Sequence, residues 1–558
     1  MLNNDNLISK DYGAYIWRQG KKIVLEKEVD RFTIIKPTWW NQKDLMLTSS
    51  IRNVEPVNDQ VFKVETDEAS LDATMKMLRS HFFGLVAHHA YRPSNTEGTT
   101  FYLTDRIIVR FSPEMCSSDI DRLIEKYCLI IINEYLHPLN TYLLQITSSS
   151  GQNPIKVANS LADEQGVIFS EPNMVHRFQA AWIPPDSLFT RQWYLEAQTG
   201  PQLYEESSLS AVAAWEITKG SRDVVVAVID NGFDISHPDF QGFNKVVHPK
   251  DYIDGDSNPF PEFGAKFNHG TPCAGIAIAE SNGTGIVGIA HGCAFMPVRF
   301  SLSASDDQLV DMFEEVARKA DVVSCSWSTP PVNSPLSQLL FDTLERIATT
   351  GGTKGKGCVL CFAAGNYNAP VRQNVNNDGF AWIDSQGRQR TTKGSILNGF
   401  AAHPFVVTVA ASTSLNRHAA YSNWGSEICI CAPSNNFHPL DRQKFVAGRS
   451  VWTTDDEAYG RGFTTSSRFT NNFGGTSAST ALVAGVAALV LSVNPNLSAT
   501  EVKEILQTTA DKITDSDPDI ISGINMGQYD SKGRSSWFGF GKVNAARAVA
   551  ESQRRLAG

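Results

Sequence analysis

The chain has 558 residues, of which 42% are hydrophobic and 19% are charged, and its net charge is −10. This length predicts two or three domains, and this composition is typical of soluble globular proteins. The negative net charge argues against nucleic acid as a general partner, because phosphate binding needs a basic surface. No basic amphipathic stretch indicates docking to a membrane.

The N-terminus and the cysteines predict where the protein works. Residues Met1–Asn6 form neither a basic n-region nor an apolar h-region, so no signal peptide is visible and we expect a cytoplasmic protein, with export by another route left open. Nine scattered cysteines indicate free thiols and a reducing compartment. Cys358 and Cys361 have redox or zinc spacing, but their apolar surroundings favour a core role. The longest apolar run, residues 481–493, is expected to be too short to span a bilayer.

Residues 1–95 form an α+β region of unknown role. Strand-like segments at Lys22–Leu25 and Phe32–Ile35 accompany an amphipathic helix near Leu71–Leu78. None of these segments indicates a chemistry. The region is either an extension of the next domain or a separate recognition module.

Residues 96–180 predict a small domain of strands and helices in the order β-α-β-β-α-β. The expected strands are Arg106–Phe111, Cys128–Tyr135, Thr141–Thr147 and Val167–Glu171, and the expected helices are Ser118–Tyr127 and Ile155–Glu164. This order predicts a ferredoxin-like α+β fold, which carries no function by itself.

Residues 181–558 predict an α/β fold with a parallel sheet covered by helices on both faces. The expected strands are Val224–Ile229, Ala294–Phe300, Asp321–Ser326, Cys358–Ala363, Phe405–Ala410 and Glu427–Ala432. The expected helices include Asp306–Ala320 and Leu336–Thr349, with a further helix that Ser498 and Glu501 begin as a capping box.

Three reactive residue types stand at the ends of expected elements in this region. Asp230 directly follows a buried strand, where functional groups of open α/β sheets lie. His269 opens a short helix of small residues, and Ser477 follows two glycines at the start of a long apolar helix. A helix N-terminus favours developing negative charge. Taken singly, each residue is as well explained as a cap or a turn, but a nucleophile, a base and an orienting acid together predict hydrolysis.

These blocks resemble those of the subtilisin-like serine proteases, which carry the triad in the order Asp, His, Ser. The resemblance covers roughly residues 184 to 550. Cys273 and the run Ser324–Trp327 are similar to the kexin-like branch of that family. The family usually has proline four residues after the nucleophile, whereas this chain has Ala481, a change that alters the helix start but removes no reacting group.

The resemblance implies further site residues. Asn366, just past a buried strand, matches the asparagine that the family uses for the oxyanion, and the backbone N–H of Ser477 would be the second donor. The candidate substrate-binding residues, which match the wall of the family's S1 pocket, are Ser324, Ser326, Trp327 and Ser328. No acid follows up to Val332, so a preference for basic side chains is not carried over.

The resemblance also implies a structural calcium ion. Asp239 and Asn282 match positions of the family's tight calcium site, and Asp186 is a third candidate. Carboxylate, amide and carbonyl oxygens suit this hard cation. The alternative is that these side chains only stabilise turns.

Residues 96–180 precede the subtilisin-like region as the family's propeptide does. The resemblance therefore implies a proenzyme whose own N-terminal propeptide assists folding and inhibits the active site, with processing between about Met174 and Pro185. The alternative is a permanently attached interaction domain. For the whole chain we predict a serine endopeptidase that acts on protein or peptide substrates. The alternatives are a catalytically silent peptide-binding module and a maturation protease dedicated to one partner peptide.

Overall fold

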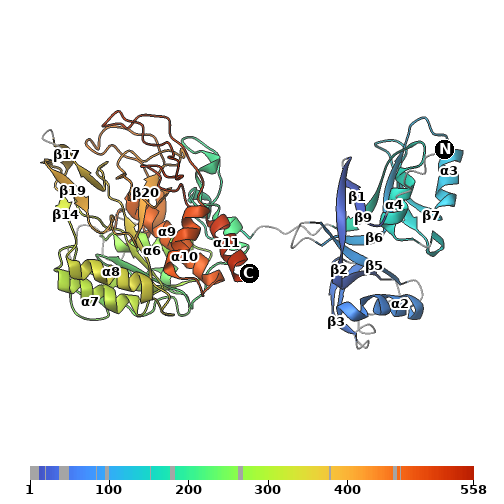
Figure 1. Cartoon of the computed structure of the whole chain (residues 1–558), viewed down its shortest axis with the longest axis horizontal. Coiled ribbons are helices and arrows are strands. Elements are labelled where there is room, and N and C mark those ends of the chain that lie inside the picture. Colours follow the sequence, from blue (N-terminus) through green and yellow to red (C-terminus); the bar gives the residue numbers. More distant parts are fainter. Residues whose placement is uncertain are drawn as a thin grey trace, which may run out of the picture. The chain divides into compact units, whose positions relative to one another are not determined.

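The structure is a computed structural model that describes residues 12–18, 20–36, 50–58, 60–82, 85–94, 100–150, 152–175, 182–261, 268–375, 379–456, 462–464 and 467–557. It divides into two compact units, Met1–Ala180 and Ala181–Gly558 (Figure 1).

The first unit begins with a five-stranded antiparallel sheet and one helix. Its elements are β1 (Tyr15–Arg18), β2 (Lys21–Ile35), β3 (Ile51–Pro56), β4 (Val61–Thr66), α2 (Leu71–His81) and β5 (Val86–Pro93). The two strand-like segments expected within residues 21–35 belong to the single long strand β2. Helix α2 packs its apolar side, including Met75 and Leu78, against Phe32 and Val64 of the sheet.

The second half of the first unit has the predicted ferredoxin-like fold. Its elements are β6 (Tyr102–Phe111), α3 (Ser117–Lys126), β7 (Leu129–Tyr135), β8 (Thr141–Ile146), α4 (Pro154–Ala162) and β9 (Val167–Val175). The strands lie in the order β7-β8-β6-β9 and all pair antiparallel. An apolar cluster joins both halves, because Ile16 and Leu25 of the first sheet pack with Leu103 and Met174 of the second. The predicted boundary near residue 95 therefore lies inside one compact unit.

The second unit is built on the predicted parallel sheet. Its seven strands lie in the order β11-β12-β10-β13-β15-β20-β21. Their bounds are β10 (Val225–Asp230), β11 (Lys250–Asp251), β12 (Ala294–Arg299), β13 (Val322–Cys325), β15 (Val359–Ala363), β20 (Val407–Ser412) and β21 (Ile430–Pro433). Strand β10 is buried on both faces, which explains its unbroken apolar run.

Helices cover both faces of this sheet (Figure 1). They are α5 (Ala211–Trp215), α6 (Gly270–Ile278), α7 (Asp306–Ala317), α8 (Gln338–Thr350), α9 (Gly475–Val493), α10 (Ala499–Thr508) and α11 (Ala545–Ala557). Successive residues of β10 alternate between two cores: Val226 and Val228 pack with α6 and α9, whereas Ala227 and Ile229 pack with α7 and α8. Helix α10 begins with the predicted capping box of Ser498.

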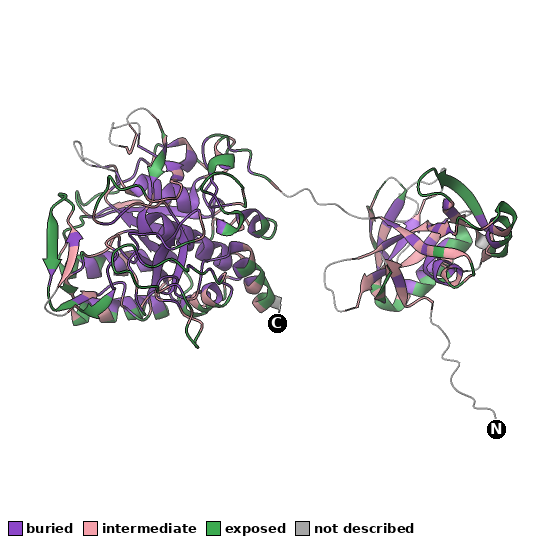
Figure 2. Cartoon of the chain, turned by 90° about the horizontal axis from the view of Figure 1, so that it is seen from above, coloured by how far each residue is buried: buried purple, intermediate pink, exposed green. Residues whose placement is uncertain are grey.

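Helix α9 is the central element of the second unit. Its 19 residues are about 28 Å long and begin at Gly475, before the predicted apolar run 481–493, so the whole helix is apolar enough to cross a membrane by length and composition although the run alone is shorter. Within the structure, 89% of its most apolar window is buried. Figure 2 shows buried residues in purple throughout the interior of this unit. It contacts α6 and the strands β13, β15 and β20, which makes it the core helix of this unit.

Three smaller groups of strands were not predicted from the sequence. Strands β14 (Asn333–Ser334), β16 (Arg372–Asn374) and β19 (Ser395–Asn398) form one sheet, and β17 (Phe380–Ile383) pairs with β18 (Gln389–Thr392). Strands β22 (Val451–Thr454) and β23 (Phe469–Phe473) form a hairpin that leads into α9.

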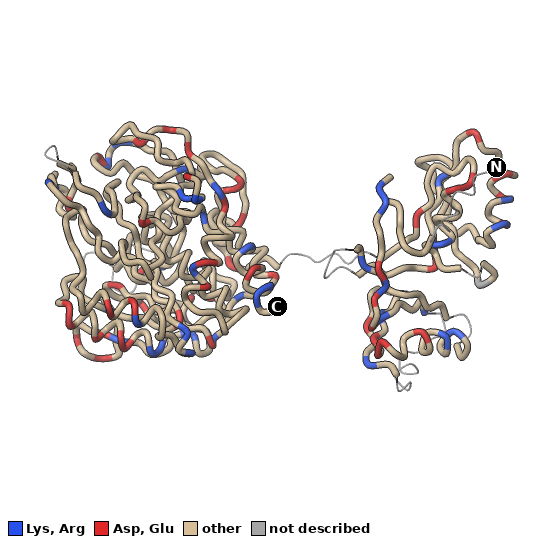
Figure 3. Tube along the Cα trace, in the orientation of Figure 1, with Lys and Arg blue, Asp and Glu red and all other residues tan. Residues whose placement is uncertain are grey.

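Basic and acidic residues are interspersed along the described trace of both units (Figure 3).

Candidate active site

The carboxyl end of strand β10 holds Asp230, whose side chain is 2% exposed. Its Oδ1 accepts a hydrogen bond of 2.8 Å from the backbone N–H of Asn231. The Asn231 side chain in turn accepts one of 2.9 Å from the backbone N–H of His269. The end of β10 and the start of α6 are therefore fastened together, which fixes the separation of the carboxylate and the imidazole.

His269 lies between the other two residues of the predicted triad. Its Nδ1 is 2.8 Å from Oδ2 of Asp230, and its Nε2 is 3.1 Å from Oγ of Ser477. Burial by itself lowers the pKa of His269, but the adjacent Asp230 carboxylate outweighs burial and raises this pKa well above its usual value. The imidazole can thus exchange a proton with the hydroxyl while the carboxylate orients it.

Ser477 is the third residue of α9 and is 5% exposed. The preceding Gly475 has φ +74°, and a Cβ there would lie 3.0 Å from Nδ2 of Asn366, so this position favours glycine for conformation and for space. The Ser477 hydroxyl also donates to the carbonyl of Ser326 over 3.0 Å. The hydroxyl is therefore held at the start of the helix, where the free N–H groups point.

Asn366 follows strand β15 and is held by the residue before Ser477. Its Oδ1 accepts two hydrogen bonds of 2.9 Å from Thr476, one from the backbone N–H and one from the hydroxyl. Because the carbonyl oxygen is occupied in this way, Nδ2 is the amide group left to donate. An N–H donor near a nucleophilic serine can stabilise an oxyanion, so Asn366 is a candidate for that role.

The four residues predicted to bind substrate lie in different surroundings. The Ser326 hydroxyl donates to the backbone carbonyl of Ser477 over 3.1 Å, and the Ser328 hydroxyl accepts from the Asn398 side chain over 2.9 Å. The side chain of Trp327 instead donates to the Ile229 carbonyl and packs against phenylalanine rings of the core. Ser324 is fully buried in the sheet, so its side chain is unavailable to a substrate in this structure.

The three candidate calcium residues lie together near the C-terminal end of α6. Asp186 accepts hydrogen bonds from the Ser281 hydroxyl at 2.7 Å and from the backbone N–H of Asn282 at 2.9 Å. The Asn282 side chain donates to Oδ1 of Asp239 over 3.1 Å. Helix α6 is about 13 Å long, so this cluster is far from His269 at the other helix end and suits a structural role.

Asp239 is the unusual member of this cluster. Its side chain is fully buried, and Oδ2 has no hydrogen-bond partner among the described residues. Burial and, secondarily, the nearby Asp186 carboxylate raise the pKa of Asp239 from 3.8 to about 7. An uncompensated buried carboxylate oxygen next to a second carboxylate fits a hard cation such as calcium, because the cation would remove the cost of burying the charge.

Cys273 is a site residue that the sequence indicated only as a family marker. Its Sγ is 3.6 Å from Nδ1 of His269, one helical turn away. Among the described residues, the donor atoms of Asp230, His269 and Cys273 form the one group of three that lies within 4.8 Å. Burial raises the pKa of Cys273, which favours the neutral thiol. The spacing of four residues on a predicted helix was the signal that could have revealed this contact.

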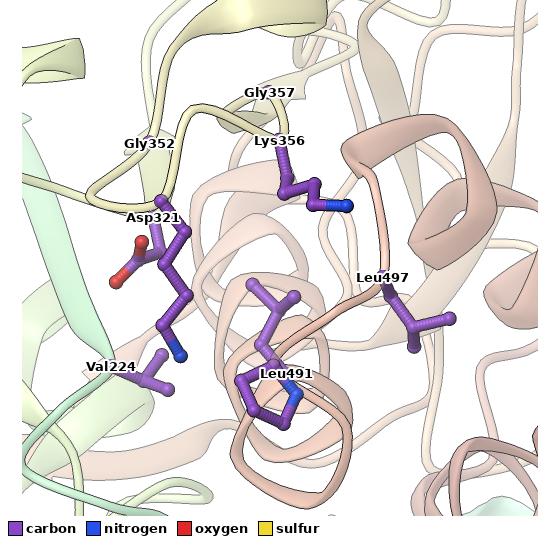
Figure 4. A pocket seen from close by; sticks show the side chains of 9 residues that line it. Val224, Asp321, Gly352, Lys356, Gly357, Leu491 and Leu497 are labelled. Carbon is purple, nitrogen blue, oxygen red and sulfur yellow. The ribbon is translucent and has the colours of Figure 1, made fainter. Parts of the chain in front are cut away.

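A small cavity of about 20 Å³ lies elsewhere, at the amino ends of the sheet strands. Figure 4 shows its lining, which includes Val224 before β10, Asp321 before β13 and Leu491 near the end of α9. The Asp321 carboxylate accepts hydrogen bonds from the backbone N–H groups of Val225 and Thr353. Asp230 and Asn366 lie at the opposite edge of the sheet, so this cavity is separate from the candidate active site.

Similarity to known proteins agrees with this geometry. A sequence profile of the Subtilase family matches residues 221–541. The chain is 31% identical over 465 residues to a calcium-dependent protease of Nostoc sp., covering 80% of this chain and 63% of that protein. It is 29% identical over 395 residues to a thermophilic serine proteinase of a Bacillus species, covering 70% and 75%. A dibasic-processing endoprotease of Yarrowia lipolytica is 27% identical over 65% of this chain and 33% of that protein.

A solved structure shows the same fold. The Aeromonas sobria serine protease, determined in complex with a chaperone, superimposes with a TM-score of 0.53 at 20% identity, over 66% of this chain and 67% of that one. The chain spans about 63% of the length of the Nostoc protein and of a similar protein of Trichormus variabilis. Since the family profile matches more than half of the residues, the chain belongs to the subtilase family of serine proteases.

Proposed function

We propose that this protein is a serine endopeptidase in which Ser477 is the nucleophile, His269 the general base and Asp230 the orienting acid. One observation carries the proposal: the His269 ring is within hydrogen-bond distance of both the Asp230 carboxylate and the Ser477 hydroxyl. A binding module has no physical need for this arrangement, because proton transfer is its only evident use.

The reaction would run through an acyl-enzyme. The Ser477 oxygen bonds to the peptide carbonyl carbon while its proton passes to Nε2 of His269. The tetrahedral intermediate then breaks its C–N bond, and His269 returns the proton to the departing amine. Water, deprotonated by the same nitrogen, releases the acyl group as a carboxylic acid and restores the hydroxyl. Asp230 stabilises the imidazolium that forms in each half of the reaction.

Asn366 would stabilise the negative oxygen of each tetrahedral intermediate. Its Nδ2 would be one donor, since Thr476 occupies its carbonyl oxygen, and the backbone N–H of Ser477 would be the second donor. The segment of Ser326 and Ser328 would line the bound peptide, because both residues lie at the candidate site. These two residues do not select a particular peptide side chain.

Labelling with a serine-directed fluorophosphonate tests the proposal. We expect the parent protein to be labelled and Ser477→Ala to remain unlabelled. Ser479→Ala is a matched control, because that buried serine lies in the same helix and donates to the Ala432 carbonyl. Equal labelling of the parent and Ser477→Ala would contradict a role for this hydroxyl.

We propose that calcium stabilises the second unit at Asp186, Asp239 and Asn282. The unpaired oxygen of Asp239 supports this assignment, and two similar proteins are named calcium-dependent proteases. The ion would neutralise the buried carboxylates and hold the loop after α6. A lower melting temperature in chelator, restored by calcium, would support it; an unchanged melting temperature would contradict it.

We further propose that the ferredoxin-like half of the first unit is a propeptide removed by the enzyme itself. Its strand order supports the proposal, as does its position before the second unit. The expected processing segment, 174–185, includes residues 176–181, which lie outside the described residues. Mass spectrometry should find a new N-terminus there in the parent but not in Ser477→Ala.

A further inference from the structure

A second cavity, of about 170 Å³, lies away from the candidate catalytic residues. It is enclosed by residues 413–420, which follow β20, and by residues 515–520, which follow α10. Its lining includes His418, which is 8% exposed, and Trp537, which is 1% exposed. Their rings stack with centroids 4.6 Å apart and an interplanar angle of 9°.

Two buried polar atoms in the lining of this cavity have no hydrogen-bond partner among the described residues: Nε2 of His418 and Nε1 of Trp537. Burial lowers the pKa of His418 to about 4, so its ring is neutral near pH 7. The ring has a hydrogen bond with the Ser422 backbone, and this bond favours a proton on Nδ1. Nε2 then carries a lone pair, which can accept a hydrogen bond from a ligand.

Three carboxylates surround the same space. Asp517, at the rim, forms an ion pair with Arg417. Asp515 and Asp519 are 7% and 6% exposed, and neither forms an ion pair with a described residue. They accept hydrogen bonds from neutral donors instead, such as the backbone N–H of His418 and the Asn368 side chain. The cavity therefore presents two buried carboxyl groups that form no ion pair with a described residue, whereas Arg417, which also lines the cavity, is paired with Asp517.

The width of the cavity favours a ligand larger than one metal ion. A calcium ion holds its oxygen ligands at 2.3–2.6 Å, so those ligands lie within about 5 Å of one another. Among the described residues, the one group of three His, Cys, Asp or Glu donor atoms within 4.8 Å is Asp230, His269 and Cys273, so the donor atoms of His418 and of the carboxylates in this cavity are spread more widely. A cation with several N–H donors spread over its head group matches the wider spacing.

We propose that this cavity binds an organic cation with an ammonium or guanidinium head on a short apolar stem. The head would donate to Asp515, Asp519 and Nε2 of His418. The stem would lie along the exposed apolar side chain of Ile520, and an acceptor beside the stem, such as a peptide carbonyl, would be the partner that Nε1 of Trp537 lacks among the described residues. Such a head group occurs on the basic side chain of a peptide and on a free amine.

This site is separate from the proposed hydrolysis, yet it is connected to its machinery. Asn368, which donates to Asp519 over 2.7 Å, is two residues after Asn366. Asn436 lines the cavity, and its neighbour Asn435 accepts a hydrogen bond of 2.9 Å from the backbone N–H of Gly475. The ligand would thus bind next to two segments that hold the oxyanion region.

The test uses the full chain with Ser477→Ala, in saturating calcium, and follows the indole N–H resonance of Trp537 by NMR. The resonance is assigned with Trp537→Phe. The probes are n-butylammonium chloride and an Ala-Arg-Ala amide peptide, with sodium chloride at equal ionic strength as the control. We expect a saturable shift with at least one probe and none with sodium chloride. Tenfold tighter binding of the peptide would identify a peptide side chain as the ligand, and comparable binding would identify a free amine.

Variants of the lining complete the test. We expect Asp515→Asn, which keeps the shape of the side chain, to weaken binding at least tenfold. The control is Asp517→Asn, since Asp517 lies at the rim and is paired with Arg417, and we expect it to change binding less than threefold. If Asp515→Asn fails to fold, Ala420→Leu should abolish binding by filling the cavity, since Ala420 is part of its lining. No saturable shift, or equal binding by the Asp515 variant and the parent, would each overturn the proposal. Because the test measures binding and every sample lacks the Ser477 hydroxyl, these results do not depend on whether Ser477 is a nucleophile.

Discussion

Thr476 donates two hydrogen bonds of 2.9 Å to the same oxygen of Asn366, one from its backbone N–H and one from its hydroxyl. Thr476 is the residue directly before Ser477, so the position of the proposed nucleophile and the orientation of the proposed oxyanion donor are fixed by one turn of chain. Removing Nδ2 of Asn366 should therefore raise the free energy of the transition state without changing the fold.

Asn366→Ala should lower kcat by about 10²–10³ with little change in KM, because the lost donor acts on charge that exists only in the transition state. Thr476→Val, which keeps the backbone bond and removes the hydroxyl bond, should have a smaller effect of about tenfold. Steady-state kinetics on a peptide substrate measures both. A larger effect on KM than on kcat would show that Asn366 binds substrate instead.

Asp230→Asn should lower kcat by about 10⁴, because an amide favours the wrong imidazole tautomer and does not stabilise the imidazolium. Asp223→Asn is the matched control, since Asp223 is exposed and precedes the other end of β10. The control should keep full activity. Similar losses in the two variants would indicate a general effect of charge or folding.

The activity should depend on the protonation of His269. The adjacent carboxylate holds the pKa of His269 well above its usual 6.5, and only the neutral ring accepts a proton from Ser477. We therefore expect kcat/KM to rise with pH through a midpoint above 6.5. In Asp230→Asn, the residual activity should show a lower midpoint. A parent midpoint below 6.5 would contradict this electrostatic coupling.

Asp239 should make stability depend on pH in the opposite direction to an ordinary surface carboxylate. Its folded-state pKa, about 7, lies above the unfolded value of 3.8, so the folded protein binds the proton more tightly. In chelator, stability should fall as the pH rises from about 4 to about 7, by up to about 4 kcal/mol. Calcium, which binds the ionised carboxylate of Asp239, should restore the stability of the folded protein above pH 7.

The variant Asp239→Asn separates these two effects. In chelator at pH 8 it should melt at or above the temperature of the parent, because it removes an unpaired buried charge. Added calcium should then give no further stabilisation. A variant that still responds fully to calcium would place the ion elsewhere.

The sequence predicted the elements that carry strong, local patterns. The apolar run before Asp230 is strand β10, because a strand buried on both faces has no polar positions to interrupt it. The two ferredoxin-like helices and the capping box at Ser498 were likewise predicted within a few residues. In each case, the signal lies within one element and needs no knowledge of distant packing.

The missed features depend on contacts between distant segments. Strand β18 is mostly exposed and polar, and its position depends on Thr392, whose hydroxyl donates to the Pro331 carbonyl and accepts from Trp382. The burial of Ser324 depends on the strands that flank β13, which a single stretch of sequence does not reveal. The predicted roles of Asp230, His269, Asn366 and Ser477 stay predictions until activity is measured.

Oδ2 of Asp239, which has no hydrogen-bond partner among the described residues, has a consequence for the lifetime of the folded protein. On the calcium proposal, the surrounding calcium concentration decides how stable the loop after α6 is, because the ion would neutralise the carboxylate of Asp239. If the chain is the proposed endopeptidase, a locally unfolded copy becomes a substrate for intact copies, so a reversible local unfolding leads to irreversible loss. Asp186 and Asp239 would then make the lifetime of the folded protein depend on the calcium concentration around it.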